Sequence, residues 1–243
     1  MTSVNMRNEF LAALPETDRT ALLDTATQVE LPARFSFYAP GELPQAIYFL
    51  ESGMASELVR MSDGRTIDGS PTGRYGFVGV PAVLGATDSF HQGVMQVPGE
   101  GLRVPIGVVQ ELYANSESFG MLAGRFLHAR FLQAIQCAAC NLLHNMKQRM
   151  ARWLLTTRMH TGTEEFHISQ EYLSEMIGAN RSTVTQCLGA LEREGLVRLD
   201  RGAINIAHYN ALRHAACECY GVIEAAFAQL MTEETEGREQ KAV

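Results

Sequence analysis

Residues 170–189 carry the pattern that most restricts the fold of this chain. Counting Gln170 as the first position, positions 4, 8, 10, 15 and 18 hold small or apolar side chains. Position 9 is a glycine, which adopts a positive φ without steric cost. Two short helices that cross closely through a tight turn need this spacing, which is filled here by Leu173, Ile177, Gly178, Ala179, Val184 and Cys187. The sequence therefore predicts a helix-turn-helix unit, with Ser169 and Asn180 as the N-caps of its two helices.

A β-hairpin is expected directly after this unit, over residues 195–206, with its tip at residues 200–202. A hairpin in this place makes the unit a winged helix-turn-helix, whose second helix enters the DNA major groove with its N-terminal end. Arginine binds guanine edges bidentately, glutamine binds adenine, and serine and threonine reach phosphates or bases. The candidate DNA-contacting residues lie at the starts of the two helices and at the hairpin tip: Ser169, Gln170, Arg181, Ser182, Thr183, Thr185, Gln186 and Arg201.

The frequency of turn-forming residues divides the rest of the chain into three segments. Residues 5–30 have apolar side chains at helical spacing and predict helix, interrupted at Pro15. Residues 31–113 have Gly or Pro every few positions, with short apolar runs between them, which predicts an antiparallel β sandwich or barrel. Residues 116–145 hold almost no helix-breaking residues and predict one long helix. The expected fold class is α+β.

The predicted long helix, about 45 Å in length, carries a stripe of side chains that steps by three and four residues. The stripe consists of Phe119, Leu122, Phe126, Ala129, Leu132, Gln133, Gln136, Ala139 and Leu143. Either it pairs with the same helix of a second copy, or it packs on the β domain of its own chain. A helix of this length between two small domains favours the first alternative, a homodimer.

Composition excludes several classes of protein. The net charge of −7 argues against a protein that coats nucleic acid throughout, although residues 141–220 hold nine Lys or Arg against eight Asp or Glu. An apolar content of 46% excludes a disordered chain. No apolar run approaches the roughly 18 residues of a membrane helix, and the first ten residues lack the apolar core of a secretory signal. Because five scattered cysteines fit a reducing compartment, we expect a cytoplasmic protein without a membrane partner.

From about Phe10 to Tyr220, the chain resembles the Crp/Fnr family of bacterial transcription regulators. Three segments carry the resemblance: residues 40–53, which begin Pro-Gly-Glu, residues 149–155, and residues 168–184. The resemblance implies an N-terminal antiparallel β-roll (a double-stranded β-helix) like that of cyclic-nucleotide-binding domains, a long dimerisation helix, and a C-terminal winged helix-turn-helix. The boundaries expected from it are residues 1–115 for the sensory β-roll, 116–146 for the dimerisation helix, 147–232 for the DNA-binding domain with its C-terminal helix (210–231), and 233–243 for a charged tail.

The resemblance also assigns roles to single residues. Arg181 matches the family's base-reading arginine, and Ser169 matches a position that contacts phosphate. Ser182 stands where many members have Glu, and Gln186 stands in place of a second Arg. These two departures predict a half-site unlike that of the cyclic-AMP receptor protein.

The effector region departs further from the family. Members that bind cyclic AMP carry a Gly-Glu pair for the ribose and an Arg-Ser pair for the cyclic phosphate. Here Gly79 and Val80 stand in the first pair of positions, and His91 and Gln92 in the second. Without the arginine, a cyclic phosphate loses its charge-assisted clamp, so we expect a small-molecule signal other than cyclic AMP. Either protonated His91 binds some other anion, or His91 is an ordinary exposed loop residue.

The cysteines leave two alternatives open. The N-terminal cluster of the family's iron–sulfur members is absent, because the first cysteine is Cys137. Cys137, Cys140 and His144 would share one helix face, and a dimer would bring two such faces together for a metal or cluster. The other alternative is that they are small buried helix residues, and we expect this one, with no metal and no cofactor. Cys217 and Cys219 form a Cys-Glu-Cys tripeptide that by itself gives only a weak signal.

The function expected is that of a homodimeric transcription regulator that reads an inverted repeat in double-stranded DNA, and not that of an enzyme. RNA polymerase is a candidate protein partner. Two alternatives remain: a constitutively DNA-binding apo regulator with a redox- or metal-responsive Cys137/Cys140 face, and an adaptor whose winged helix binds no DNA. A metal-dependent enzyme is disfavoured because residues 31–113 contain a single histidine, His91, and no paired metal ligands.

Overall fold

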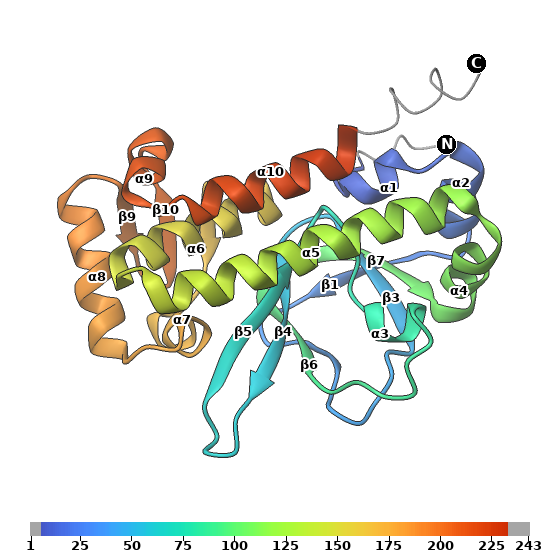
Figure 1. Ribbon diagram of the computed structural model, residues 1–243, viewed down its shortest axis with the longest axis horizontal. Coiled ribbons are helices and arrows are strands. Elements are labelled where there is room, and N and C mark those ends of the chain that lie inside the picture. Colours follow the sequence, from blue (N-terminus) through green and yellow to red (C-terminus); the bar gives the residue numbers. More distant parts are fainter. Residues whose placement is uncertain (1–5, 233–243) are drawn as a thin grey trace.

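A computed structural model describes residues 6–232 of the chain (Figure 1). The charged tail expected at residues 233–243 lies outside the described residues. Residues 1–5, half of the segment that we expected to lack a secretory signal, lie outside them as well. Two helices, α5 (Glu117–Leu143) and α10 (Cys219–Thr232), run side by side from a helical C-terminal head to a body rich in strands (Figure 1). Over residues 6–232, the helices are all too short or too polar to cross a membrane.

The N-terminal segment is only partly helical. Two short helices, α1 (Glu9–Ala13) and α2 (Glu16–Leu23), are separated at Pro15, as expected. The helix predicted over residues 5–30 is wrong at its C-terminal end, because Thr27–Leu31 form strand β1. This strand pairs antiparallel with β7 (Gly99–Pro105), whose backbone supplies the hydrogen bonds. A partner so distant in sequence overrides local spacing, which is the usual reason for such an error.

The strand-rich body consists of two antiparallel sheets, in the orders β1-β7-β3 and β2-β6-β4-β5. Their remaining strands are β2 (Ser36–Tyr38), β3 (Ala46–Leu50), β4 (Met54–Arg60), β5 (Thr66–Thr72) and β6 (Gln92–Val97). Side chains from both sheets meet in one apolar cluster, in which the rings of Phe35, Phe37 and Tyr48 pack edge-on at centroid distances of 4.8–6.1 Å. The antiparallel β domain predicted from the turn spacing is thus confirmed, and aromatic rings occupy its interior.

Helix α5 confirms the predicted long helix, and Ser116 caps it by accepting a hydrogen bond from the Phe119 N–H at 3.1 Å. Most of the stripe that we assigned to a second copy faces the chain itself. Phe119, Leu122 and Phe126 are buried in a core that they share with side chains of α1, β3 and α10. The interpretation that this stripe pairs two copies is therefore wrong, and the alternative, packing on the body of its own chain, holds for these residues.

The C-terminal head begins with α6 (Met146–Thr161), which Asn145 starts with a capping box. A three-stranded sheet, in the order β8-β10-β9, and four further helices follow. Their bounds are β8 (Glu165–His167), α7 (Gln170–Ile177), α8 (Arg181–Arg193), β9 (Val197–Asp200), β10 (Ala203–Ile206), α9 (Tyr209–Ala215) and α10. The helical stretch expected over residues 210–231 is two helices, broken at residues 216–218.

The head packs directly on the β-roll. Arg34 lies over the Tyr172 ring of α7 at 4.5 Å, and its guanidinium is 3.7 Å from the Glu175 carboxylate. Met54 and Val97 of the roll also belong to the same apolar cluster as the core of the head. The orientation of the helix-turn-helix relative to α5 is therefore set by a shared core, and not by a flexible linker.

A buried histidine gives the fold a predictable response to acid. His160 of α6 is 1% exposed, and its Nε2 lies 3.3 Å from Gln133 Oε1. Burial lowers its pKa from 6.5 to about 3, with the positive charges of Arg130 and Arg74 adding to the effect, so the ring is neutral in the folded protein. The unfolded chain takes up this proton below pH 6.5 and the folded chain does not, so stability is lost as the pH falls from 6.5 towards 3. We expect the free energy of unfolding, measured by urea denaturation, to fall by about 2 kcal/mol between pH 7 and pH 5 because of this group.

Two variants separate this contribution from that of the carboxyl groups. His160→Gln should flatten the fall in unfolding free energy between pH 7 and pH 5. His167→Gln replaces an imidazole that is 69% exposed and should leave the fall unchanged. An equally steep fall in His160→Gln would show that the buried ring does not stay neutral.

Candidate nucleic-acid interface

The helix-turn-helix predicted from the sequence is formed by α7 and α8. The Tyr172 N–H donates to Ser169 Oγ at 3.1 Å, so Ser169 caps α7 as predicted. Gly178 ends α7 with φ 68°, a conformation that strains other residues. The apolar positions that predicted the unit are buried between the helices, except Ala179, which is half-buried: Leu173, Ile177, Val184 and Cys187. Local spacing alone was sufficient to predict this part of the structure.

The start of α8 faces solvent. Arg181, Ser182 and Gln186 are exposed, and Thr183 is half-buried. Asn180 stands at the N-cap position, but its side chain makes no capping hydrogen bond, unlike the cap expected for it. The first N–H groups of α8 are thus left to other acceptors, and such groups at a helix start attract anions such as phosphate.

The wing brings a second cation beside this helix start. Strands β9 and β10 pair antiparallel, and Gly202, with φ 80°, allows the turn that leaves Arg201 exposed at the tip. Ser169, Gln170, Arg181 and Arg201 together line a hollow of about 340 Å³ between α7, α8 and the wing. Four of the eight candidate residues are thus brought to one surface feature.

The other four candidates lie along α8 beyond the lining of the hollow. The Thr185 hydroxyl is 2.7 Å from Gln170 Oε1 and joins the starts of the two helices. Ser182, Thr183 and Gln186 complete the same end of the helix. Arg198, on β9, is exposed as well and adds a cation to the wing. The surface combines a helix end that fits a major groove with flanking cations that fit phosphates.

Sequence comparisons identify the same unit. The Crp-like helix-turn-helix domain matches residues 148–215. The global nitrogen regulator of a Nostoc species is 26% identical over 181 residues, which cover 70% of this chain and 81% of that protein. The cAMP-activated, CRP-like global transcriptional regulator of Mycobacterium tuberculosis is 25% identical over 211 residues, which cover 81% of this chain and 91% of that protein.

A solved structure extends the similarity of fold to most of the chain. A transcriptional regulator of the Crp/Fnr family from Eubacterium rectale superimposes with a TM-score of 0.61 at 17% identity, covering 84% of this chain and 95% of that one. Residues 148–215 thus form a Crp-like helix-turn-helix domain, and the chain has the fold of the Crp/Fnr regulators. The chain is therefore a DNA-binding transcription regulator of the Crp/Fnr type.

The four effector candidates do not form one polar site among the described residues. Gly79, with φ 111°, caps the short helix α3 (Val80–Val83), and Val80 is buried in the apolar core. His91 faces solvent. Gln92 starts β6, and its side chain donates to Ser36 Oγ at 3.4 Å. The apolar environment of Val80 cannot serve a ribose as a carboxylate would.

A polar network links the β-roll to α5 instead. The Tyr38 hydroxyl donates to Glu57 Oε1 at 3.1 Å, and the Arg130 guanidinium of α5 lies 3.4 Å from the same carboxylate. Arg130 also donates to Ser70 Oγ at 3.2 Å. Burial by itself would raise the pKa of Glu57, but Arg130 and the Tyr38 hydroxyl bring it below its ordinary value. The carboxylate is therefore charged and fixes α5 to two strands of the roll.

The cysteines are arranged differently from the predicted face. Cys137 lies apart: its Sγ accepts a hydrogen bond from Arg152 at 3.1 Å, and burial raises its pKa to about 11. Cys140 and His144 do lie together, but with Cys217 and Cys219, for which the sequence held only a weak signal. The sequence offered one clue, the Cys-Glu-Cys tripeptide, but no means of knowing that it folds back onto the end of α5.

Proposed function

We propose that this chain binds double-stranded DNA as a homodimer that reads an inverted repeat, and that it responds through its β-roll to a signal other than cyclic AMP. The observation that carries the proposal is the exposed start of α8, where Arg181 and Gln186 face solvent beside Arg201 of the wing. Arginine and glutamine are the side chains that bind guanine and adenine edges in pairs of hydrogen bonds. Arg201 and Ser169 flank them as phosphate contacts that fix the register.

A second face of α5 supports the homodimer. Seven exposed residues step by three and four along the helix, and we call them the outer seam: Met121, Gly124, His128, Phe131, Ile135, Ala138 and Leu142. Phe131 is 61% exposed and Leu142 is 87% exposed, which is costly for side chains of this size unless a partner covers them. A two-stranded coiled coil buries this repeat. Twofold pairing along the seam gives the symmetry that an inverted repeat matches.

The β-roll supports a signal other than cyclic AMP. Val80 is buried where a carboxylate would have to hold a ribose, and no arginine stands at His91 or Gln92. A signal that rearranges the interior of the roll would reach α5 through the ion pair of Glu57 and Arg130, and from there the head. In this proposal residues 1–115 sense the signal, 116–146 dimerise and 147–232 bind DNA, with RNA polymerase as the candidate protein partner.

The test is selection of bound genomic duplexes by the purified protein under anaerobic conditions, followed by titration at several salt concentrations. We expect an inverted repeat with half-site centres about 34 Å apart. With 6–10 phosphate contacts, affinity should fall about 10³- to 10⁵-fold between 50 and 200 mM salt.

Two results would contradict the proposal. A folded protein that binds no duplex at any salt concentration, with or without cell extract as a source of the signal, would favour the adaptor. The second is a set of selected sites that changes when the protein is oxidised. If Cys137→Ser abolishes this change, the result would favour the redox-responsive Cys137/Cys140 face.

A further inference from the structure

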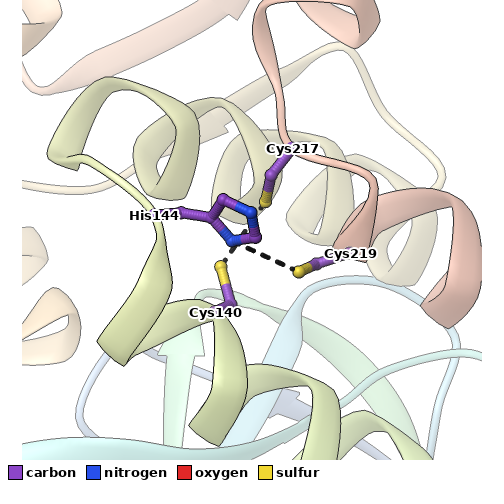
Figure 2. Close-up of side chains that lie close together, drawn as sticks. All are labelled: Cys140, His144, Cys217 and Cys219. Atoms are coloured by element: carbon purple, nitrogen blue, oxygen red, sulfur yellow. Dashed lines mark hydrogen bonds between the residues drawn. The ribbon is translucent and has the colours of Figure 1, made fainter.

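Four potential metal ligands converge where α5 meets the turn between α9 and α10. Cys140 and His144 come from the end of α5, and Cys217 and Cys219 come from the other side of the contact (Figure 2). All four donor atoms lie within 4.8 Å of one another. Cys140 Sγ is 3.5 Å from Cys217 Sγ, and Cys219 Sγ is 3.6 Å from His144 Nδ1. We propose that these residues form a Cys₃His zinc site that fastens the DNA-binding head to the long helix.

The distances fit a single tetrahedral ion. Zinc binds sulfur at about 2.3 Å and histidine nitrogen at about 2.0–2.1 Å, which puts tetrahedral donors roughly 3.5–3.8 Å apart. Two of the pairs already have this separation, and small side-chain rotations bring the wider pairs to it. An iron–sulfur cluster needs donors spread over several iron atoms, whereas these four point to one centre (Figure 2).

The surroundings match those of a structural zinc site. Cys140, Cys217 and Cys219 are 0%, 5% and 1% exposed, so the site has no position open to substrate. His144 Nε2 lies 3.2 Å from the Glu218 carboxylate, the outer contact that orients a metal-binding imidazole so that Nδ1 faces the ion. The Gln136 amide donates to Cys219 Sγ at 3.2 Å, a bond that suits a thiolate acceptor.

The charge of the site is also balanced locally. Three thiols lose their protons to solvent when they bind Zn²⁺, which leaves one net negative charge. The buried Arg152 guanidinium, which contacts Cys137, lies beside Cys140 and compensates for this charge. The inference is independent of the proposed function, since the ligands hold the chain together whether or not the head binds DNA.

The test uses the full chain, freed of any affinity tag and dialysed, with zinc, iron and acid-labile sulfide measured per chain. We expect about one zinc, no sulfide, and tetrahedral thiolate–cobalt absorption after exchange with Co²⁺. Removal of the metal by a chelator should lower the Tm by on the order of 10 °C, and added Zn²⁺ should restore it.

Variants identify the ligands. Cys219→Ala and His144→Ala should lose the bound zinc, whereas Cys137→Ser, one turn earlier on α5, should keep it. Because a ligand variant can fail to fold, alkylation of the unmodified chain is a second measurement: zinc should protect Cys140, Cys217 and Cys219 from N-ethylmaleimide, and Cys137 should react equally with and without the metal.

Three results would overturn the inference. The first is a folded chain that holds no zinc and shows no change in Tm or absorption with Zn²⁺ or Co²⁺. The second is iron with sulfide in place of zinc. The third is a Cys140–Cys217 disulfide, found by mass spectrometry, in protein purified under reducing conditions.

Discussion

Ile135→Asp is expected to convert the protein from a dimer to a monomer and to abolish tight binding to an inverted repeat. Ile135 lies in the middle of the outer seam and is 50% exposed in the single chain, so an aspartate there leaves the chain's own core intact. In the dimer, two like charges would be buried against an apolar neighbour. A buried charge without a partner costs about 3–5 kcal/mol, which corresponds to a rise of roughly 10²- to 4 × 10³-fold in the dimer dissociation constant.

Sedimentation equilibrium measures the dimer, and titration of a full and a half inverted repeat measures its consequence. We expect the variant to bind both duplexes with the same weak affinity, because a monomer contacts one half-site. Met61→Asp is the matched control, since Met61 is 53% exposed in the turn between β4 and β5 and is not part of the outer seam. If Ile135→Asp remains a dimer, another surface joins the two copies and the outer seam has a different role.

The two stripes of α5 show where sequence reasoning reaches its limit. The period of three and four residues predicts a helix correctly, but Phe119 and Leu122 on one face and Met121 and Phe131 on the other follow the same period. The choice between the faces depends on what the rest of the chain places against them, here α1, β3 and α10. A helix with apolar side chains on two faces therefore cannot be oriented from its own sequence.

The helix-turn-helix is the opposite case. The cap at Ser169, the positive φ of Gly178 and the turn at Gly202 depend on residues within a few positions of one another, so local sequence was sufficient to place them. The cluster of Cys140 with Cys217 depends on a contact 77 residues apart in sequence. Nothing in the spacing of the cysteines reveals which loop closes onto which helix.

Arg181→Ala is expected to have the largest effect on sequence recognition. A guanidinium at the start of α8 can donate two parallel hydrogen bonds to a guanine, and its loss should cost about 1–3 kcal/mol per half-site and relax the preference at one base position. The measurement is repeated site selection with the variant, together with affinities for the preferred duplex and its single-base substitutions.

Arg193→Ala and Arg201→Ala separate base reading from electrostatic attraction. Arg193 is exposed on the last turn of the same helix, at the end away from the groove, and its loss should leave the preferred site unchanged. Loss of Arg201 should weaken all duplexes alike and reduce the salt slope by about one, because it removes a phosphate contact. If Arg181→Ala behaves like Arg201→Ala, with uniform weakening and an unchanged preferred base, then Arg181 binds phosphate. Gln186 and Ser182 would then contact the bases, and these are the two positions at which this chain departs from the Crp/Fnr pattern.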